Sequence, residues 1–529
     1  MAQYTSQEFR KQRSQLINKV MTSDLHGKRI YLLGSAEFGP TNEPMLVKST
    51  VGLYNKFGKQ GTLIDAFHAI KYVNKDNKVY LVKTTGEHAT AYLNVNIKDG
   101  EIIEDGFTIA AAESNEIYND IEIIVDIKSI SFIFPEYMGI SKKVYKYKDY
   151  PTIDKLASAI NKDTRNKKSK LYAYYSVDPS TPTENAFFVC NPISVYMYGG
   201  QCGLNYSKNL LYNCLARTYD MIESEDIDIV VPVDAFLDDI YPDDSEGTQD
   251  RYGMRYYQST KDYLTEDFTG KQLSFMDQCI NFCIKQLNFG VVTMGVLGFN
   301  PKARFASDYL AEADELKEMY QACFQYNLKH CTNAFYAFMV SCVAGDIRYN
   351  HGTIIDNGYL AYASFCSKIK INCGTTNIPI SPRIAIYEEF SEEVLQEMAE
   401  TGIVTFRHSP LYNTPVVHDG VTACPDNENL KLFANVRMIQ MCISYINKLL
   451  QSYIGYNMVD LVKDEVIIED LHHILEVLVS KNIITQYNFK IMPYYATGEL
   501  KLYLTLMTCY MVKAVTLCTV VNMEFDEEV

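Results

Sequence analysis

With 529 residues, 47% of them hydrophobic and 22% charged, the chain has the composition of a globular protein of two to four domains. Its formal net charge of −16 argues against nucleic acid as a direct partner, because phosphate backbones are bound by basic surfaces. The start of the chain lacks the apolar stretch of a secretory leader, and none of the 14 cysteines forms a CxxC pair. Reduced thiols are therefore expected, rather than disulfides or zinc ligands.

The first 92 residues are predicted to contain an arm and the first part of an α/β core. Residues 1–27 indicate a basic, weakly amphipathic helix or an extended arm, whose cationic residues are Arg10, Lys11, Arg13 and Lys19. The segment 28–92 predicts an apolar strand ending at Gly34, a second strand at 45–47, a helix over 63–73 and a buried strand over 78–83. The glycines after the first strand fit neither GxGxxG nor GxxxxGK[ST], so a nucleotide-binding loop is not expected.

The segment 93–190 is β-rich and more polar, which predicts a small inserted β-sandwich domain. Strands are expected at 121–127, 131–134, 143–147 and 171–175. A short helix over 151–161 leads into a basic run, 162–168, that is expected to be a solvated loop.

The segment 191–424 alternates helices and apolar strands, as the second part of an α/β core should. Helices are expected at 209–222, 275–287, 308–329, 358–368 and 391–401, and strands at 227–234, 290–298, 335–343 and 402–407. Carboxylates surround the first of these strands and suggest a metal or acid–base site: Asp226, Asp228, Asp234, Asp238, Asp239, Asp243 and Asp244. The alternative is a buried parallel strand that leaves the sheet through a polar loop.

The segment 425–516 predicts an α+β domain built from two helices and alternating strands. Apolar residues recur at three- and four-residue spacing over 433–454 and again over 463–481, whereas Leu alternates with polar residues over 499–506. The second helix carries acidic residues opposite its apolar stripe: Asp464, Glu465, Glu469, Asp470 and Glu476. A β-rich run over 514–521 precedes the acidic tail 524–528, and the 504–521 stretch is too short and too polar for stable membrane insertion.

No enzyme is predicted, and neither a cofactor nor a metal is expected. The nine histidines are dispersed, and the chain contains neither a Gly-x-Ser-x-Gly elbow nor an HExxH motif. His330 beside Cys331 indicates local packing rather than a nucleophile–base pair.

Several short motifs, in this order, resemble the contractile tail sheath proteins, the outer tubes of contractile phage tails and related injection machines. The N-terminal motifs are the turn from Gly34 to Pro40, the Phe57-Gly58 pair and the strand 79–82. The C-terminal motifs are the helix start at 435–437, the segment 482–484 and the strands around Gly498. The resemblance extends from about residue 28 to residue 521.

The resemblance implies a central α/β core, an inserted domain on the outer surface and a C-terminal α+β domain that faces an inner tube. It further implies stacked hexameric rings around a tail tube protein, with baseplate and tail terminator proteins as partners. Such a sheath assembles in the host cytoplasm, belongs to the virion tail and contracts to drive the tube through the host envelope. The alternatives are the sheath of a tailocin or another injection system, or an α/β enzyme that uses the Asp234–Asp244 region.

The resemblance also implies terminal arms that add strands to sheets of neighbouring subunits. The C-terminal arm would be 517–529, with Leu517, Thr519, Val521, Met523 and Phe525 in the contact. At the N-terminus the chain lacks the Pro-Gly-Val-Tyr-like strand of many sheaths, so a helix and a short extended arm remain alternatives there. The acidic helix 463–481 would face the tube, or else be a solvated face. Whether cysteines cross-link subunits stays open.

Overall fold

The protein is described from a computed structural model that covers most of residues 29–508. The residues it does not describe within that range are 98–100, 167–168, 188–190, 207, 239–247, 250–254, 257–273, 300–312, 350–354, 388, 410, 413, 455–465, 495–496 and 498. The fold is mixed α/β with several separate sheets, as the sequence predicted. Among the described helices, none is both long and apolar enough to cross a membrane.

The core is organised around a seven-stranded sheet, ordered β19-β15-β14-β11-β1-β3-β2. Its strands are β1 (Arg29–Gly34), β2 (Met45–Val47), β3 (Lys78–Lys83), β11 (Ile229–Pro232), β14 (Met294–Gly298), β15 (Val340–Val343) and β19 (Ile403–Val404). All pairs are parallel except β2 with β3, at one edge. The central strands are buried along their whole length, which explains why their sequences are runs of Val, Ile and Leu rather than alternations.

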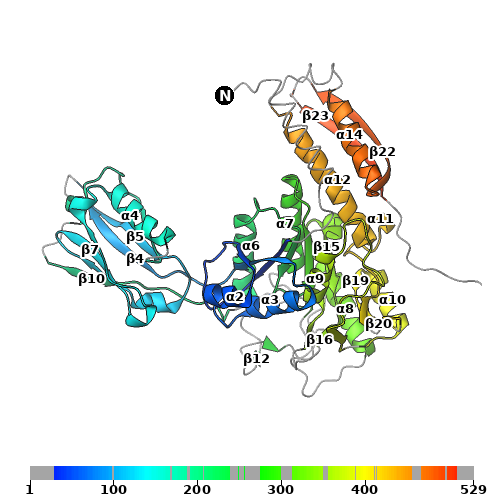
Figure 1. Ribbon diagram of the computed structural model, residues 1–529, viewed down its shortest axis with the longest axis horizontal. Helices are drawn as coiled ribbons and strands as arrows, with labels where there is room; N and C mark the ends of the chain where they lie inside the picture. Colours follow the sequence, from blue (N-terminus) through cyan, green and yellow to red (C-terminus); the bar gives the residue numbers. More distant parts are fainter. Residues whose placement is uncertain are drawn as a thin grey trace, which may run out of the picture.

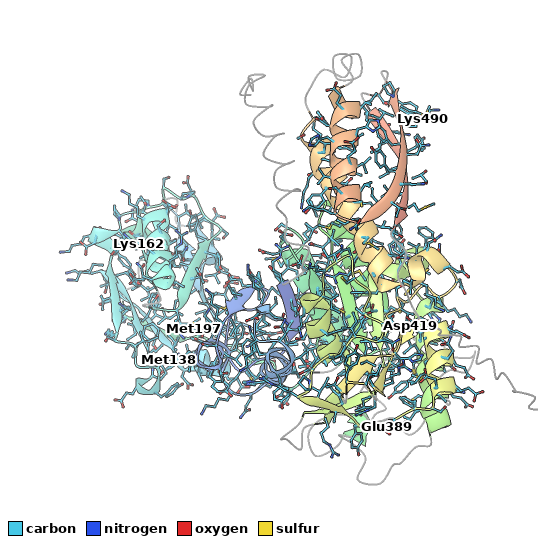
Figure 2. All side chains as sticks on the ribbon, turned by 45° about the vertical axis from the view of Figure 1, so that its right-hand side comes forward. Met138, Lys162, Met197, Glu389, Asp419 and Lys490 are labelled. Atoms are coloured by element: carbon cyan, nitrogen blue, oxygen red, sulfur yellow. The ribbon has the colours of Figure 1, made fainter. Side chains whose placement is uncertain are left out.

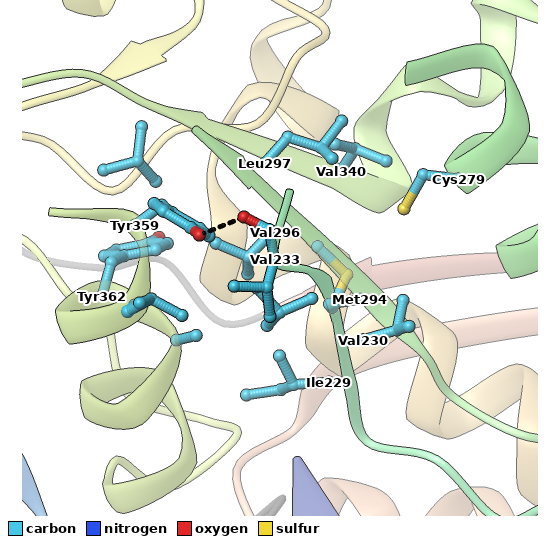
Figure 3. Close-up of a cluster of buried hydrophobic side chains, with 14 of the residues drawn as sticks. Ile229, Val230, Val233, Cys279, Met294, Val296, Leu297, Val340, Tyr359 and Tyr362 are labelled. Carbon is cyan, nitrogen blue, oxygen red and sulfur yellow. Dashed lines mark hydrogen bonds between the residues drawn. The ribbon is translucent and has the colours of Figure 1, made fainter. Parts of the chain in front are cut away.

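Helices cover both faces of this sheet (Figure 1). They are α2 (Thr50–Phe57), α3 (Thr62–Val73), α6 (Lys208–Met221), α7 (Phe275–Asn288), α8 (Ala313–Lys329), α9 (Tyr359–Lys368) and α10 (Glu392–Thr401). The α9 helix packs on α3 and on four central strands, and α7 packs on β14 and β15 beside α6 and α8. Tyr359 and Tyr362 of α9 lie on one side of the strands and Cys279 of α7 on the other (Figure 3).

Small strand pairs complete the core. These are β12 (Thr248–Gln249) with β13 (Arg255–Tyr256), β16 (Asp346–Tyr349) with β17 (Ile355–Asn357) and β18 (Ile384–Ile386), and β20 (Phe406–Ser409) with β21 (Thr414–Val417). The predicted strand 335–343 is only partly correct, because its first half is the 3₁₀ helix η6 (Ala334–Met339). A buried apolar run of that length fits a strand and a helical turn equally well.

A second unit, with its own hydrophobic core between Ala89 and Met197, stands apart from the central sheet (Figure 1). One sheet is ordered β4-β5-β9 and the other β10-β6-β7-β8. Their bounds are β4 (Thr90–Asn96), β5 (Ile102–Ala111), β6 (Glu122–Val125), β7 (Ser129–Ile133), β8 (Lys143–Lys146), β9 (Leu171–Tyr175) and β10 (Ile193–Tyr196). The helix α4 (Ile153–Arg165) packs on β9, and the short helices are η1 (Glu116–Asp120), η2 (Glu136–Met138), η3 (Tyr147–Asp149) and α5 (Thr183–Ala186).

Two chain segments join this unit to the core. They meet through the bridges Glu87↔Gln201 and Thr90↔Tyr198. A Cβ on Gly203, whose φ is +71°, would lie only 2.3 Å from the backbone nitrogen of Gly86, so the two backbones touch at this point.

The C-terminal unit contains α11 (Glu428–Lys431), α12 (Phe433–Gln451), α14 (Val466–Ser480), β22 (Ile484–Tyr494) and β23 (Glu499–Thr508). The predicted helix pair and the alternating strand over 499–506 are present. A third hydrophobic cluster lies between the two long helices and the hairpin of β22 and β23.

Candidate functional site

The hairpin of β22 and β23 is the candidate assembly site. Its strands pair in antiparallel register from Tyr494↔Glu499 to Ile484↔Thr508, with one irregularity after Ile484. Within the described part of the chain no third strand joins this sheet. The outer edge of each strand therefore presents a row of N–H and C=O groups to which another strand can add.

One face of the hairpin is only half covered. Alternation places seven apolar side chains on the face toward α12 and α14: Tyr487, Phe489, Ile491, Leu500, Leu502, Leu504 and Leu506. All seven are partly exposed, whereas Leu471 and Leu475 of α14, in the same cluster, are 0% exposed. Two helices thus do not suffice to bury the apolar face of this sheet.

The acidic residues predicted on α14 divide into two groups. Glu469 and Glu476 are exposed, as expected for a charged outer face. Asp470 is 1% exposed and its Oδ2 accepts a hydrogen bond from the Tyr453 hydroxyl, so its predicted position on that face is wrong. The reason is helical spacing: Asp470 lies three residues after Ile467 and four before Ile474, on the apolar stripe.

The remaining predicted contact residues lie outside the described part of the chain. They are Asp464 and Glu465 before α14, the arm residues Arg10, Lys11, Arg13 and Lys19, and the arm residues Leu517, Thr519, Val521, Met523 and Phe525. Their roles stay predictions.

A polar stripe on α12, which the sequence did not single out, joins the C-terminal unit to the core. Arg437, Gln440, Ser444 and Asn447 follow each other at three- and four-residue spacing on the side away from α14. Arg437 Nη1 donates to the Cys366 carbonyl at 3.1 Å, and Ser444 Oγ and Asn447 Nδ2 donate to carbonyls that follow or end α7. The helix is therefore apolar toward α14 and polar toward the core. The signal was present in the spacing, but the apolar stripe obscured it.

The alternative acid site centres on Asp234, after the C-terminal end of β11. In the sheet β3 lies on one side of β1 and β11 on the other, so the strand order switches direction between β1 and β11. Ligands of open α/β sheets bind at such a switch point. Here the carboxylate is occupied: Asp234 Oδ2 accepts hydrogen bonds from Thr62 Oγ1, at 2.6 Å, and from the Tyr206 hydroxyl. Thr62 Oγ1 accepts in turn from Ser35 N at 3.0 Å. The side chains of Thr62 and Tyr206 therefore occupy hydrogen-bonding positions on Asp234 that a ligand would need.

The other carboxylates near β11 do not converge on Asp234. Asp226 and Asp228 precede the strand and pair with Arg29, whose Nε lies 2.9 Å from Asp228 Oδ2. Asp238 is buried after the strand, and Asp239, Asp243 and Asp244 lie outside the described residues. Six residues of extended chain separate Asp228 from Asp234, about 20 Å. Among the described residues, no group of three or more His, Cys, Asp or Glu could hold a metal ion.

Burial disfavours the thiolate form of several described cysteines. Burial, together with the negative charge of the neighbouring Asp277, raises the pKa of Cys331 to about 12. His330 Nδ1 lies 2.8 Å from the Tyr326 carbonyl, with which it shares a hydrogen bond, so the imidazole is held by its own helix. This pair is local packing, as the sequence predicted. Burial likewise raises the pKa of Cys366 and Cys442 to about 12.

Comparisons with known proteins gave a result for structures only. No protein-family model matches the chain, and no curated protein matches it either. A sheath tail protein from Listeria innocua is 13% identical, with a TM-score of 0.47, over 94% of this chain and 99% of that one. A sheath tail protein from Desulfitobacterium hafniense is 11% identical, with a TM-score of 0.45, over 92% and 98%.

A third similar structure belongs to an injection system. The helical sheath of the anti-feeding prophage in its contracted state is 12% identical, with a TM-score of 0.37, over 64% of this chain and 78% of that one. The structural neighbours of this chain are thus sheath tail proteins and the sheaths of contractile injection systems, the class to which its sequence motifs pointed.

Proposed function

We propose that the chain is the structural subunit of a contractile tail sheath, and that the open hairpin of β22 and β23 is its polymerisation site. A C-terminal arm, 517–529, adds a strand to the hairpin of a neighbouring subunit. The observation that carries the proposal is the hairpin itself, with two edges that no described strand pairs and a half-covered apolar face. Strand addition supplies main-chain hydrogen bonds along an edge and apolar cover for the face.

The arm has the sequence that this role requires. In an extended strand every second side chain lies on the same face, so Leu517, Thr519, Val521, Met523 and Phe525 share one side. The residues between them include Asn522, Glu524 and Asp526, which suit the solvent side. The added strand therefore offers an apolar face to the half-covered leucines.

The finer assembly follows from the same proposal. Subunits form stacked hexameric rings around an inner tail tube protein, with the C-terminal unit inside and the inserted β-rich unit outside. Glu469 and Glu476, exposed on α14, face a basic tube surface, together with Asp464 and Glu465 of the same segment. Each exposed ionic contact is weak, on the order of 0–1 kcal/mol, but it recurs in every subunit. The basic N-terminal arm, with Arg10, Lys11, Arg13 and Lys19, meets an acidic C-terminal tail across the joint between subunits.

In a phage this sheath belongs to the virion tail, assembles in the host cytoplasm between the baseplate and the tail terminator, and contracts to drive the tube through the host envelope. A tailocin or another injection system would use the same subunit in the same way. Among the described residues, the carboxylates around β11 do not support an enzymatic role, because Asp226 and Asp228 pair with Arg29 and Asp234 accepts hydrogen bonds from Thr62 and Tyr206.

Electron microscopy of the purified protein tests the proposal. Hollow tubes are expected on concentration, and deletion of 517–529 should abolish them while the far-UV circular dichroism spectrum stays that of a folded protein. Two adjacent valines provide a matched pair: Val521→Asp places a charge against the hairpin and should abolish the tubes, whereas Val520→Asp points to solvent and should not. Tubes that persist without 517–529 would refute the proposed role of the C-terminal arm. A wild-type protein that never polymerises would refute the proposal that the chain is a sheath subunit.

A further inference from the structure

The inserted unit carries a concentrated positive charge in an acidic protein. Residues 128–170 contain ten Lys and one Arg but only four Asp and Glu, a formal charge of +7 in a chain of −16. Several of these cations lie on or beside β8 and on α4, and Figure 2 shows Lys162 away from the central sheet.

The cations lie in two neighbouring rows. In the first row Lys142 and Lys146 are exposed along β8, on the side opposite the buried ring of Tyr145, and Lys148 is exposed in η3 directly after the strand. This strand is at the edge of its sheet, and four residues of extended chain separate Lys142 from Lys146, about 13 Å.

In the second row Lys155, Lys162 and Arg165 are exposed on α4, opposite its buried apolar side. Ten helical residues separate the ends of this row, about 15 Å. The two elements that carry these rows are neighbours, because Asp163 of α4 accepts a hydrogen bond from the Tyr145 hydroxyl of β8 at 3.0 Å and lies 3.9 Å from Lys143 Nζ. We call these six exposed cations the basic patch.

The acidic residues near the patch do not neutralise it. Asp163 is engaged by β8, as described. Asp154 accepts a hydrogen bond from the Tyr175 hydroxyl at 3.0 Å, and Asp149 is exposed at the end of η3. Six exposed cations therefore lie beside two exposed carboxylates, Asp149 and Asp154, and a net positive surface remains.

The chemistry of the patch favours one class of polyanion. Single-stranded nucleic acid needs exposed aromatic rings for stacking, but the rings that alternate with the lysines of the first row, Tyr145 and Tyr147, are 4% and 0% exposed, and the exposed ring of Tyr137 lies in η2, outside both rows. A membrane surface needs apolar side chains that insert, and the first row exposes one, Val144. Flexible lysines in two rows suit instead a narrow chain that carries a point charge at every repeat.

We propose that the basic patch binds a linear polyphosphate, a single flexible chain of linked phosphate groups. The patch and the hairpin of β22 and β23 lie on different units, so this binding does not depend on polymerisation of the chain (Figure 1). Each contact releases counterions, and four net contacts should make the affinity fall by about 50-fold between 50 and 200 mM salt.

Titration of the full chain with long-chain inorganic polyphosphate tests the inference. The triple variant Lys142→Glu, Lys146→Glu and Lys162→Glu should bind at least 30-fold more weakly than wild type at 50 mM salt. The matched control replaces three exposed lysines of the core, Lys48, Lys59 and Lys75, by Glu, which changes the net charge equally and should leave binding within about threefold. All six positions are exposed, so both variants should keep the wild-type melting curve.

Three outcomes would overturn the inference. Absence of polyphosphate binding at 50 mM salt would show that polyphosphate is not a ligand. Equal losses of affinity in the two triple variants would show that binding depends on the net charge of the chain and not on the basic patch. Tighter binding of duplex DNA with the same number of phosphates, or of vesicles of an anionic phospholipid, would assign the patch to a different partner.

Discussion

Lys83 is buried at the joint between the core and the inserted unit, where its charge gives a sharp test of how the two units pack. This last residue of β3 is 0% exposed, and its Nζ donates a hydrogen bond to the Ser114 carbonyl of the inserted unit at 2.8 Å. Burial lowers the pKa of the ammonium from 10.5 to about 8. We predict that this single group makes the protein more stable as the pH rises above neutrality.

The sign and size follow from proton linkage. The unfolded chain keeps the Lys83 proton up to its ordinary pKa of 10.5, whereas the folded protein releases it near 8. Between these values the unfolded state binds more protons, so the free energy of unfolding increases with pH. From pH 7 to pH 9.5 the increase due to this group is about 2 kcal/mol.

Urea denaturation followed by far-UV circular dichroism measures the effect. Wild type and Lys83→Met are compared at pH 7 and pH 9.5, so that contributions from other titrating groups cancel in the difference. The stability of wild type relative to Lys83→Met should rise by about 2 kcal/mol. Lys78→Met, at the exposed start of the same strand, should show no such rise. A difference between wild type and Lys83→Met that does not change with pH would refute the buried charge.

Three further substitutions probe separate parts of the fold by chemical denaturation. Gln440→Leu should raise the free energy of unfolding by about 1–3 kcal/mol, because both amide atoms of this buried side chain lack partners among the described residues. Gln451→Leu at the exposed end of α12 is its control and should be neutral. Thr62→Val should lower the free energy of unfolding by about 1–3 kcal/mol, because Asp234 loses a hydrogen bond. An unchanged stability would contradict the hydrogen bond between Thr62 and Asp234. Gly402→Ala should cost about 1–2 kcal/mol, because the glycine ends α10 at a φ of +103°, and a neutral result would contradict that conformation.

The sequence predicted the core strands well where burial is complete on both faces. Residues 229–232 are an apolar run that is buried at every position and lies between Asp228 and Asp234, and such a run has few alternatives in an α/β pattern. It failed at 334–339, where a buried apolar run forms a 3₁₀ helix that packs on α7. Periodicity cannot separate these two outcomes, because both bury every side chain.

The joint of α12 with the core shows a second limit. Arg437, Gln440, Ser444 and Asn447 follow each other at three- and four-residue spacing and define a polar helix face, and such a face ordinarily lies in solvent. In the structure this face is buried against carbonyls such as that of Cys366, 71 residues away in the chain. Partners at that separation are set by how the units pack, and no local pattern encodes them. The prediction that Asp470 lies on the exposed acidic face is wrong for a related reason. A hydrogen bond from the Tyr453 hydroxyl allows its carboxylate to be buried.

The hairpin of β22 and β23 is where sequence and structure together carry the functional argument. Alternation of Leu500, Leu502, Leu504 and Leu506 predicts which face is buried, but not how much apolar surface the rest of the chain supplies to cover it. The described residues supply two helices and no third strand, so the same leucines stay partly exposed. Added strands would lower the free energy of this unit through main-chain hydrogen bonds and apolar burial at once. Under the proposed function, completing the fold of one subunit and joining it to the next are therefore a single step with one driving force.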